Sequence, residues 1–227
     1  MVAFLCQEKL LFIVPGFSFL SGLKKTMQEA INYLSSKDQK LKFILDNFGH
    51  PIIQKREEGF ASMCHIILEQ QVSIASAKAC YIKLENYFTF ITPEILLNAT
   101  DEELRNCGVS RQKSSYLKDL ASKVISNEID FATFCSKSED QIRKELLTIK
   151  GVGNWSIEVY LMFCLQAPDI IPLGDIAIVN TMKELYEIHD KSDLEIYTND
   201  WSPHRTFASF LLWHYYLLKK RAIKKQD

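Results

Sequence analysis

Two features of the sequence combine residue types that could do chemistry, and the first is a glycine hairpin. Gly151 and Gly153 flank a single apolar residue within the segment Leu146–Trp155. Two glycines at this spacing allow a tight turn with exposed backbone amides, and exposed amides beside a helix N-terminus form a natural phosphate site. Such a hairpin would hold a nucleic-acid backbone without reading its sequence. Taken alone, a Gly-x-Gly between helices more often marks an ordinary turn.

The second feature is Asp175, which follows the hairpin. It lies 20 residues after Trp155, between a loop and a new apolar segment. One interpretation is that Asp175 is simply a helix N-cap, a role that suits aspartate well. It can also combine capping with chemistry, because a helix N-terminus stabilises the ionised carboxylate. The hairpin and Asp175 together indicate a phosphate site followed by a charged group that could take part in a reaction.

The elements that must position these residues are helices. Capping patterns predict five helix starts, three of them capping boxes and two an N-cap followed by proline. These starts are Thr26, Thr100 and Ser138, and then Thr92 and Ser202. Apolar residues recur at helical spacing over 41–48 and 74–88, and Gly49 and Gly108 stand where a C-cap glycine belongs. The pattern predicts an all-α fold of about ten helices joined by short links.

Composition limits the kinds of protein that this chain can be. Its 227 residues, 47% of them hydrophobic, are enough for one core or for two small lobes. The 27 Lys and Arg residues nearly cancel the 28 Asp and Glu residues, which excludes a diffuse polycation, so any DNA contact must come from a local basic surface. The 6 cysteines lack the close pairs of zinc or iron–sulfur sites, and we expect reduced core thiols.

Residues 1–25 form a leader of unknown role. They are apolar but interrupted by Glu8, Lys9 and Pro15, which makes the segment too short for a membrane span. The charged start and small-residue cleavage site of a secretory signal are both missing. We therefore expect no membrane partner and a cytoplasmic protein.

Four blocks of the sequence, two of them before the hairpin with Asp175 and one after it, resemble the helix-hairpin-helix, Gly/Pro-rich-loop and aspartate superfamily of DNA glycosylases. The likeness is closest to the branch of 3-methyladenine DNA glycosylase II and runs from near Met27 to Trp213. The blocks are residues 67–78, residues 107–121, the hairpin with Asp175, and residues 201–213. The resemblance implies two helical lobes that flank an active-site cleft: lobe A, about 60–170 with the hairpin, and lobe B, about 26–59 plus 171–227.

The resemblance also assigns roles to individual residues. It makes Asp175 the catalytic residue and places Trp155, Trp213 and Tyr160 around the base pocket. It also makes Gln71 the intercalating residue, which fills the gap left by a flipped nucleotide. The DNA contacts that it implies come from Gln71, Ser73, Arg111, Lys113, Lys150, Gly151, Gly153 and Arg205. By themselves, tryptophans in helices more often pack in a core, and basic side chains are more often solvated.

The reaction that the resemblance implies is hydrolysis of the N-glycosidic bond of a damaged base flipped out of duplex DNA. Breaking this bond builds positive charge on the deoxyribose, which the carboxylate of Asp175 would stabilise while it orients or deprotonates a water molecule. Alkylated purines are positively charged and stack well on tryptophan faces. We therefore expect a monomeric hydrolase of the 3-methyladenine glycosylase II type, with damaged double-stranded DNA as its partner.

Position 155 separates two reaction types. Family members that also cleave the strand form a Schiff base with a lysine there, and Trp155 cannot do so, so a monofunctional enzyme is expected. No cysteine follows Cys164, and an iron–sulfur cluster is not expected. We expect that no cofactor or metal is required, with a monovalent cation at the hairpin, residues 148–153, left open.

Three departures from the resembled enzyme leave alternatives open. Val159 and Ile176 stand where its pocket has tyrosines, and His204 replaces a tryptophan. His204 could be a general acid, or a histidine that faces DNA or satisfies a cap. The lesion could instead be hypoxanthine, ethenoadenine or uracil. A non-catalytic DNA-binding module is a further alternative, but it would leave Asp175 and the pocket tryptophans without a purpose.

Overall fold

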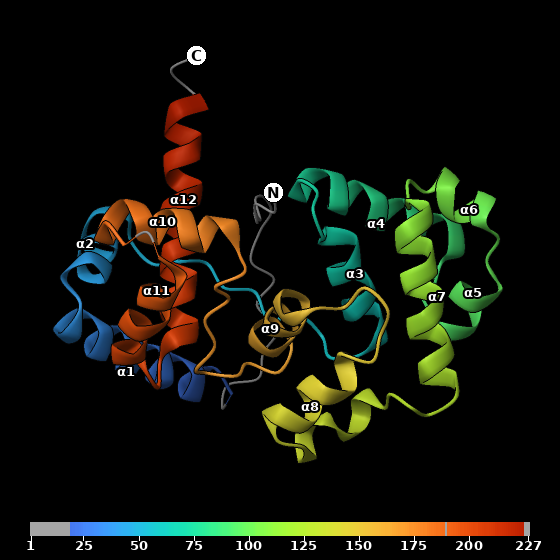
Figure 1. Ribbon diagram of the computed structural model, residues 1–227, viewed down its shortest axis with the longest axis horizontal. Coiled ribbons are helices and arrows are strands. Elements are labelled where there is room, and N and C mark those ends of the chain that lie inside the picture. Colours follow the sequence, from blue (N-terminus) through green and yellow to red (C-terminus); the bar gives the residue numbers. More distant parts are fainter. Residues whose placement is uncertain (1–18, 189, 225–227) are drawn as a thin grey trace. The chain divides into compact units, whose positions relative to one another are not determined.

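A computed structural model of the chain describes residues 19–188 and 190–224 (Figure 1). These residues form twelve α-helices and two 3₁₀-helices, and no β-strand occurs among them. The predicted all-α fold is confirmed. The chain divides into two compact units: unit 1 comprises residues 54–167, and unit 2 combines the described residues before 54 with those from 168 onward. The leader and lobe boundaries drawn from the sequence stay predictions, and residues 1–18 of the leader lie outside the described residues.

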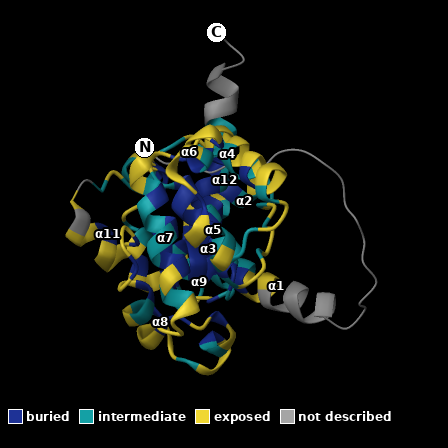
Figure 2. Cartoon of the chain, turned by 90° about the vertical axis from the view of Figure 1, so that its right-hand side faces the viewer, coloured by how far each residue is buried: buried dark blue, intermediate teal, exposed yellow. Residues whose placement is uncertain are grey.

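Unit 1 is built around α3, which contacts α4, α7 and α9. Met63, Ile66 and Ile67 of α3 are fully buried, as expected for a helix that is apolar nearly all round. Figure 2 shows the contrast with α8 and α11, which are largely exposed. The helices of unit 1 are α3 (Phe60–Glu69), α4 (Ile74–Phe88), α5 (Pro93–Asn98), α6 (Asp101–Asn106), α7 (Arg111–Ile125), η1 (Phe131–Ser136), α8 (Glu139–Leu146) and α9 (Asn154–Phe163).

Unit 2 joins the N-terminal helices to the C-terminal ones, because α12 contacts α1, α2 and α10. Asp38 ties these distant segments together from a buried position. Its carboxylate caps α2 by accepting bonds from the amides of Lys40 and Leu41, and it also accepts bonds from Tyr186 and from Trp201 Nε1 at 2.8 Å. The helices of unit 2 are α1 (Phe19–Lys37), α2 (Gln39–Phe48), α10 (Ile176–Tyr186), α11 (Lys191–Thr198), η2 (Asn199–Trp201) and α12 (Arg205–Lys224).

Three of the five predicted helix starts are confirmed, all of them in unit 1. Thr100 and Ser138 form complete capping boxes, with Glu103 and Gln141 respectively reaching back to the cap amide. Thr92 caps α5 by accepting a bond from the amide of Ile95. The predicted glycines also close helices: Gly49 caps α2, and Gly108 has a φ of 90° directly after the cap of α6.

The other two predicted starts, Thr26 and Ser202, are wrong. Helix α1 already begins at Phe19, because leucines and lysines ahead of Thr26 have high helix propensity and extend the helix through it. Ser202 closes η2 instead of opening α12, which begins at Arg205. The amide of Arg205 donates to Asp169 Oδ1 at 3.2 Å, so a residue distant in sequence satisfies the helix N-terminus in place of the serine.

Candidate functional site

The predicted glycine hairpin is present between α8 and α9. Gly151 has a φ of 75°, which glycine adopts without strain. The amide of Val152 donates to the carbonyl of Ile149 and closes the turn, while the amide of Lys150 donates to Asp119 Oδ2 at 2.8 Å. Within the described chain, the amides of Gly151 and Gly153 donate to no protein acceptor, and both glycines are exposed. Two exposed donors beside the start of α9 have the arrangement that binds phosphate.

The turn between α3 and α4, residues 70–73, presents Gln71 to solvent. Gln71 has a φ of 55°, a left-handed conformation that is uncommon and mildly strained for a residue with a side chain. Ser73 is the N-cap of α4 and accepts a bond from the amide of Ser76 at 3.2 Å. The exposed position of Gln71 fits an intercalating residue, which stays a prediction, as does DNA contact by Ser73 beside its capping role.

The basic residues predicted to contact DNA differ in their surroundings. Arg111 and Lys150 are exposed. Lys113 is half-buried, and its ammonium donates to the carbonyls of Leu68 at 2.6 Å and Gln70 at 2.8 Å. Burial lowers the pKa of Lys113 from its usual value. Lys113 therefore binds the protein's own main chain. Its sequence position did not indicate this role, since both carbonyls lie more than forty residues away.

Asp175 is the N-cap of α10, as its place in the sequence predicted. Its Oδ1 accepts bonds from the amides of Ala177 at 2.8 Å and Ile178 at 3.2 Å. The residue is only 2% exposed, whereas the next one, Ile176, is 40% exposed. These two amides are among the first donors of the helix, which have no partner within the helix itself. Asp175 is therefore held in a fixed position and a fixed orientation.

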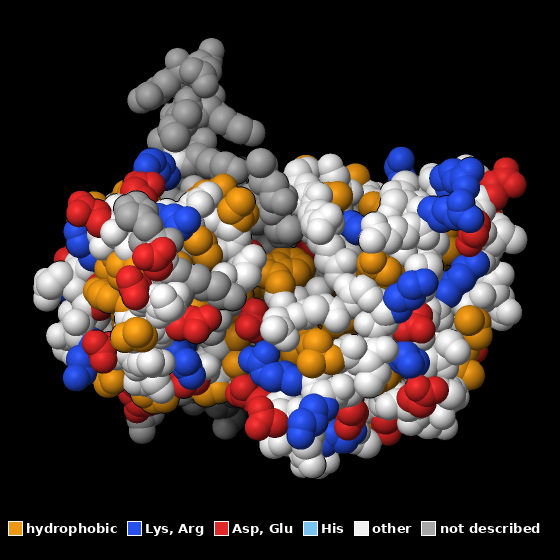
Figure 3. Space-filling model, in the orientation of Figure 1, with side chains coloured by type: hydrophobic (Ala, Val, Ile, Leu, Met, Phe, Trp, Pro, Cys, Tyr) orange, Lys and Arg blue, Asp and Glu red, His pale blue; other side chains and the backbone are white. Residues whose placement is uncertain are grey.

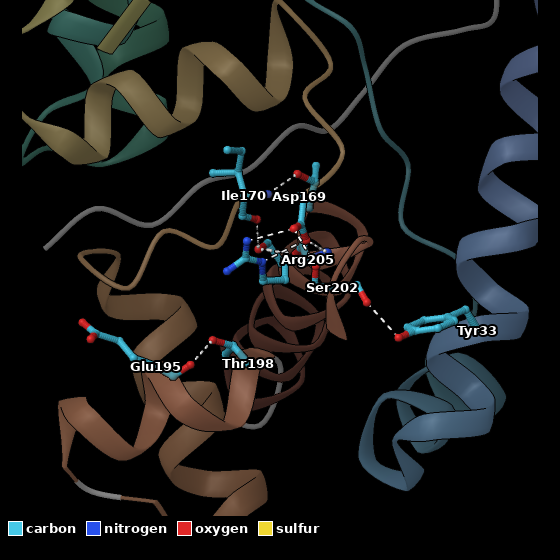
Figure 4. Close-up of polar contacts among 9 residues, drawn as sticks. Tyr33, Asp169, Ile170, Glu195, Thr198, Ser202 and Arg205 are labelled. Atoms are coloured by element: carbon cyan, nitrogen blue, oxygen red, sulfur yellow. Dashed lines mark hydrogen bonds and ion pairs between the residues drawn. The ribbon is translucent and has the colours of Figure 1, made fainter. Parts of the chain in front are cut away.

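The loop that leads to Asp175 is anchored on the start of α12 (Figure 4). Arg205 binds Asp169 through two bonds, Nε to Oδ1 at 2.9 Å and Nη2 to Oδ2 at 2.8 Å. Burial works against the charge of Asp169, but its bonds from Arg205 and Ser202 hold the pKa of this carboxyl below its usual value. Ile170 adds a bond from its amide to Thr206. Arg205, which is predicted to touch DNA, thus holds the loop that precedes Asp175 in the chain.

The three aromatic residues predicted for a base pocket lie in different surroundings. Trp155, the second residue of α9, is half-buried in unit 1. Tyr160 is fully buried in the same unit, where its hydroxyl accepts a bond from the amide of Gly59 and its ring packs near Phe131, which is the environment of a core residue. Trp213 is 4% exposed and lies on α12 of unit 2, the unit that also holds Asp175. The pocket role of all three stays a prediction.

Of the three departures, Val159 is fully buried, and the ring of His204 packs edge-on against Tyr33. The surface shown in Figure 3 carries Lys and Arg side chains as well as Asp and Glu side chains on both units. Among the described residues, no group of three His, Cys, Asp or Glu side chains is arranged to hold a metal ion. No helix in the described part of the chain has the length and apolar character needed to cross a membrane.

Comparison with known proteins identifies the family. The model of the HhH-GPD superfamily of base excision DNA repair proteins matches residues 64–203, more than half of the chain. An alkylbase DNA glycosidase-like protein of Schizosaccharomyces pombe is 28% identical, over 82% of this chain and 92% of its own length.

Two solved structures are similar in both sequence and fold. The 3-methyladenine DNA glycosylase of Schizosaccharomyces pombe in complex with abasic DNA is 26% identical, with a TM-score of 0.75 over 82% of this chain and 95% of that one. A DNA-3-methyladenine glycosidase from Bacillus halodurans is 30% identical, with a TM-score of 0.71 over 82% of this chain and 88% of that one. The chain therefore belongs to the HhH-GPD superfamily of base excision DNA repair proteins.

Proposed function

We propose that this protein is a monofunctional DNA glycosylase that flips alkylated purines of the 3-methyladenine type out of duplex DNA and removes them by hydrolysis. The observation that carries the proposal is the carboxylate of Asp175 in a member of this family. Two hydrogen bonds from backbone amides hold this carboxylate at the N-terminus of α10. The names of the relatives support the substrate class, because they are 3-methyladenine or alkylbase glycosylases.

Asp175 would act on the sugar of the flipped nucleotide. As the bond between C1′ and the purine nitrogen breaks, its electrons leave with the base, and a cationic alkylated base departs as a neutral molecule. Positive charge then develops on the sugar, where a fixed carboxylate stabilises it. Water attacks C1′ and loses a proton, which Asp175 can accept and pass to solvent. The products are a free base and an abasic site in an intact strand.

The hairpin and the turn after α3 would hold the DNA while this happens. The exposed amides of Gly151 and Gly153 would bind phosphate oxygens, with Arg111 and Lys150 as flanking cations. Gln71 would fill the place of the extruded nucleotide, which lowers the cost of a few kcal/mol for unstacking a base. Trp155 and Trp213 would offer aromatic faces to the cationic purine.

The proposal includes no required cofactor, one copy of the chain on double-stranded DNA, and a place of action at the bacterial-type nucleoid in the cytoplasm. A monovalent cation at residues 148–153 is compatible with the hairpin. The carbonyls of Ile149 and Gly151 each accept one hydrogen bond, and a carbonyl oxygen keeps a second lone pair that could face a cation. Such an ion would help to hold the hairpin against phosphate.

A panel of damaged duplexes tests the function. Each carries one lesion: 3-methyladenine, 7-methylguanine, 1,N6-ethenoadenine, hypoxanthine or uracil. Abasic sites are counted after incubation with the protein and with its Asp175→Asn variant. We expect release of the alkylated purines by the wild-type protein alone. Release of only hypoxanthine, ethenoadenine or uracil would assign another lesion, and no release from any duplex would favour a DNA-binding module without catalysis.

A further inference from the structure

Gln70, the residue before the proposed intercalating Gln71, connects the α3–α4 turn to the glycine hairpin. Its Nε2 donates to the carbonyl of Gly151 at 3.0 Å and to Ser156 Oγ at 2.9 Å. These acceptors lie 81 and 86 residues further along the chain, on the hairpin and on the first turn of α9. One amide group thus bonds to the hairpin and to the helix that follows it.

Lys113 fixes the same turn from a different direction. Its ammonium, on the first turn of α7, donates to the carbonyls of Leu68 and Gln70 and so binds the orphan carbonyls at the end of α3. Between these bonds lies Glu69, which is 5% exposed and receives two bonds of 2.9 Å from Arg56. Burial raises the pKa of Glu69, while the charges of Arg56 and Lys113 act in the opposite direction.

The turn is therefore held on both sides of the strained residue. Lys113 and Gln70 fix the backbone just before Gln71, and Ser73 caps α4 just after it. A side chain that must enter a base stack is effective only when its backbone is already placed, because ordering it during insertion would cost free energy. The same bonds set the distance between Gln71 and the hairpin amides.

We propose that Gln70 and Lys113 are positioning residues that join the intercalating turn and the phosphate-binding hairpin into one rigid element. When the hairpin binds the DNA backbone, this element places Gln71 for insertion. This inference rests on the proposed function. It concerns opening of the base stack, and neither residue is assigned a contact with the reacting atoms. Lys113 accordingly acts on the DNA through the turn and not as a phosphate ligand.

The test uses variants that remove the bonds while keeping side-chain size: Gln70→Leu and Lys113→Met. Lys144→Met, on the exposed face of α8, is the matched control for the loss of one positive charge. Gln71→Ala reports complete loss of the intercalating group. Three quantities are measured for each protein: the unfolding midpoint, the affinity for an undamaged duplex, and the fluorescence of 2-aminopurine placed beside a tetrahydrofuran abasic-site analogue.

We expect Gln70→Leu and Lys113→Met to bind undamaged duplex within about twofold of wild type, because the exposed hairpin amides remain. The equilibrium for opening the stack should fall by about tenfold, the size expected for losing a hydrogen bond of about 1.4 kcal/mol, and approach that of Gln71→Ala. Single-turnover base release at saturating enzyme should fall by the same factor. Lys144→Met should match wild type in all three measurements.

The split between binding and opening decides the inference. Equal losses in duplex affinity and in 2-aminopurine signal would overturn it, since they would show only a general structural role or a direct phosphate contact. Unchanged fluorescence in both variants would also overturn it. If Lys113→Met does not fold, Gln70→Leu still tests the inference by itself, because the side chain of Gln70 is only half-buried. The fluorescence requires no catalysis, so a wild-type protein that releases no base would defeat the proposed function alone.

Discussion

The ring of Tyr116 lies against the backbone of Gly151, so closely that a Cβ on Gly151 would come within 2.2 Å of Tyr116 Cε2. Contacts of a real Cβ below 3.0 Å essentially do not occur. A Cβ on Gly153 would meet nothing within 4 Å, and Gly153 has an extended backbone. Packing within the protein therefore requires a glycine at position 151 and leaves room for a side chain at position 153. Under the proposed function, that room at position 153 is used by the DNA phosphate.

Alanine at each position should separate packing within the protein from DNA binding. Gly151→Ala combines the clash with Tyr116 and a positive φ, and we expect it to lower the free energy of unfolding by about 2 kcal/mol or more. Gly153→Ala should change stability by less than about 0.5 kcal/mol and still weaken binding to every duplex alike, because its Cβ would take up part of the exposed surface where we propose that phosphate binds. Chemical denaturation and fluorescence anisotropy measure the two effects. Loss of affinity for only certain sequences would mean that the hairpin reads bases.

Among the ion pairs described in unit 1, breaking the buried pair of Arg56 and Glu69 should lower the free energy of unfolding the most. Arg56→Met leaves the carboxylate of Glu69 buried without its main partner, and we expect a loss of about 3–5 kcal/mol in unfolding free energy at pH 7. The loss should shrink at acidic pH, where Glu69 can be protonated. Lys42→Met, which breaks the exposed pair with Asp46, serves as the control and should cost at most about 1 kcal/mol. Equal costs for the two variants would show that burial of the pair has no energetic weight.

His65 should make stability depend on pH between about 4 and 6.5. Burial and the charge of Arg56 lower the pKa of His65 to about 4, and Glu69 and Tyr81 are its other neighbours. The unfolded chain binds the proton first as the pH falls, so stability is fully present above pH 6.5 and is lost toward pH 4, by about 3 kcal/mol in total. His65→Gln removes this proton uptake. Its unfolding free energy should therefore change less over the interval, and identical pH profiles would rule out His65 as the source.

The residue at position 155 predicts the products of the reaction. Attack by water leaves an intact strand, whereas attack by an amine leaves an imine that borohydride traps. We expect the wild-type protein to give free base, no trapped complex, and strand breaks only after alkali or heat. A covalent complex would contradict the monofunctional assignment. Lys150, an exposed lysine on the hairpin, would then be the first residue to replace.

Local patterns explain which features could be predicted from the sequence. The capping boxes at Thr100 and Ser138, the glycine hairpin and the cap at Asp175 all depend on residues within a few positions of one another. The sequence could not show where Lys113 and Arg205 bind, because their partners lie 45 and 36 residues away and meet them only in the folded units. The wrong cap at Ser202 has the same origin, since the carboxylate of Asp169 satisfies the start of α12.

The most direct measurement of the central claim is single-turnover base release by Asp175→Asn on a duplex with one 3-methyladenine. Asparagine caps a helix about as well as aspartate, so folding should be unchanged while the negative charge at the sugar is lost. Asp193→Asn, an exposed carboxylate on α11, is the control and should react like wild type. We predict that Asp175→Asn releases base about a thousandfold more slowly and binds the duplex with equal or higher affinity. Turnover comparable to wild type would contradict the assignment of Asp175 as the catalytic residue.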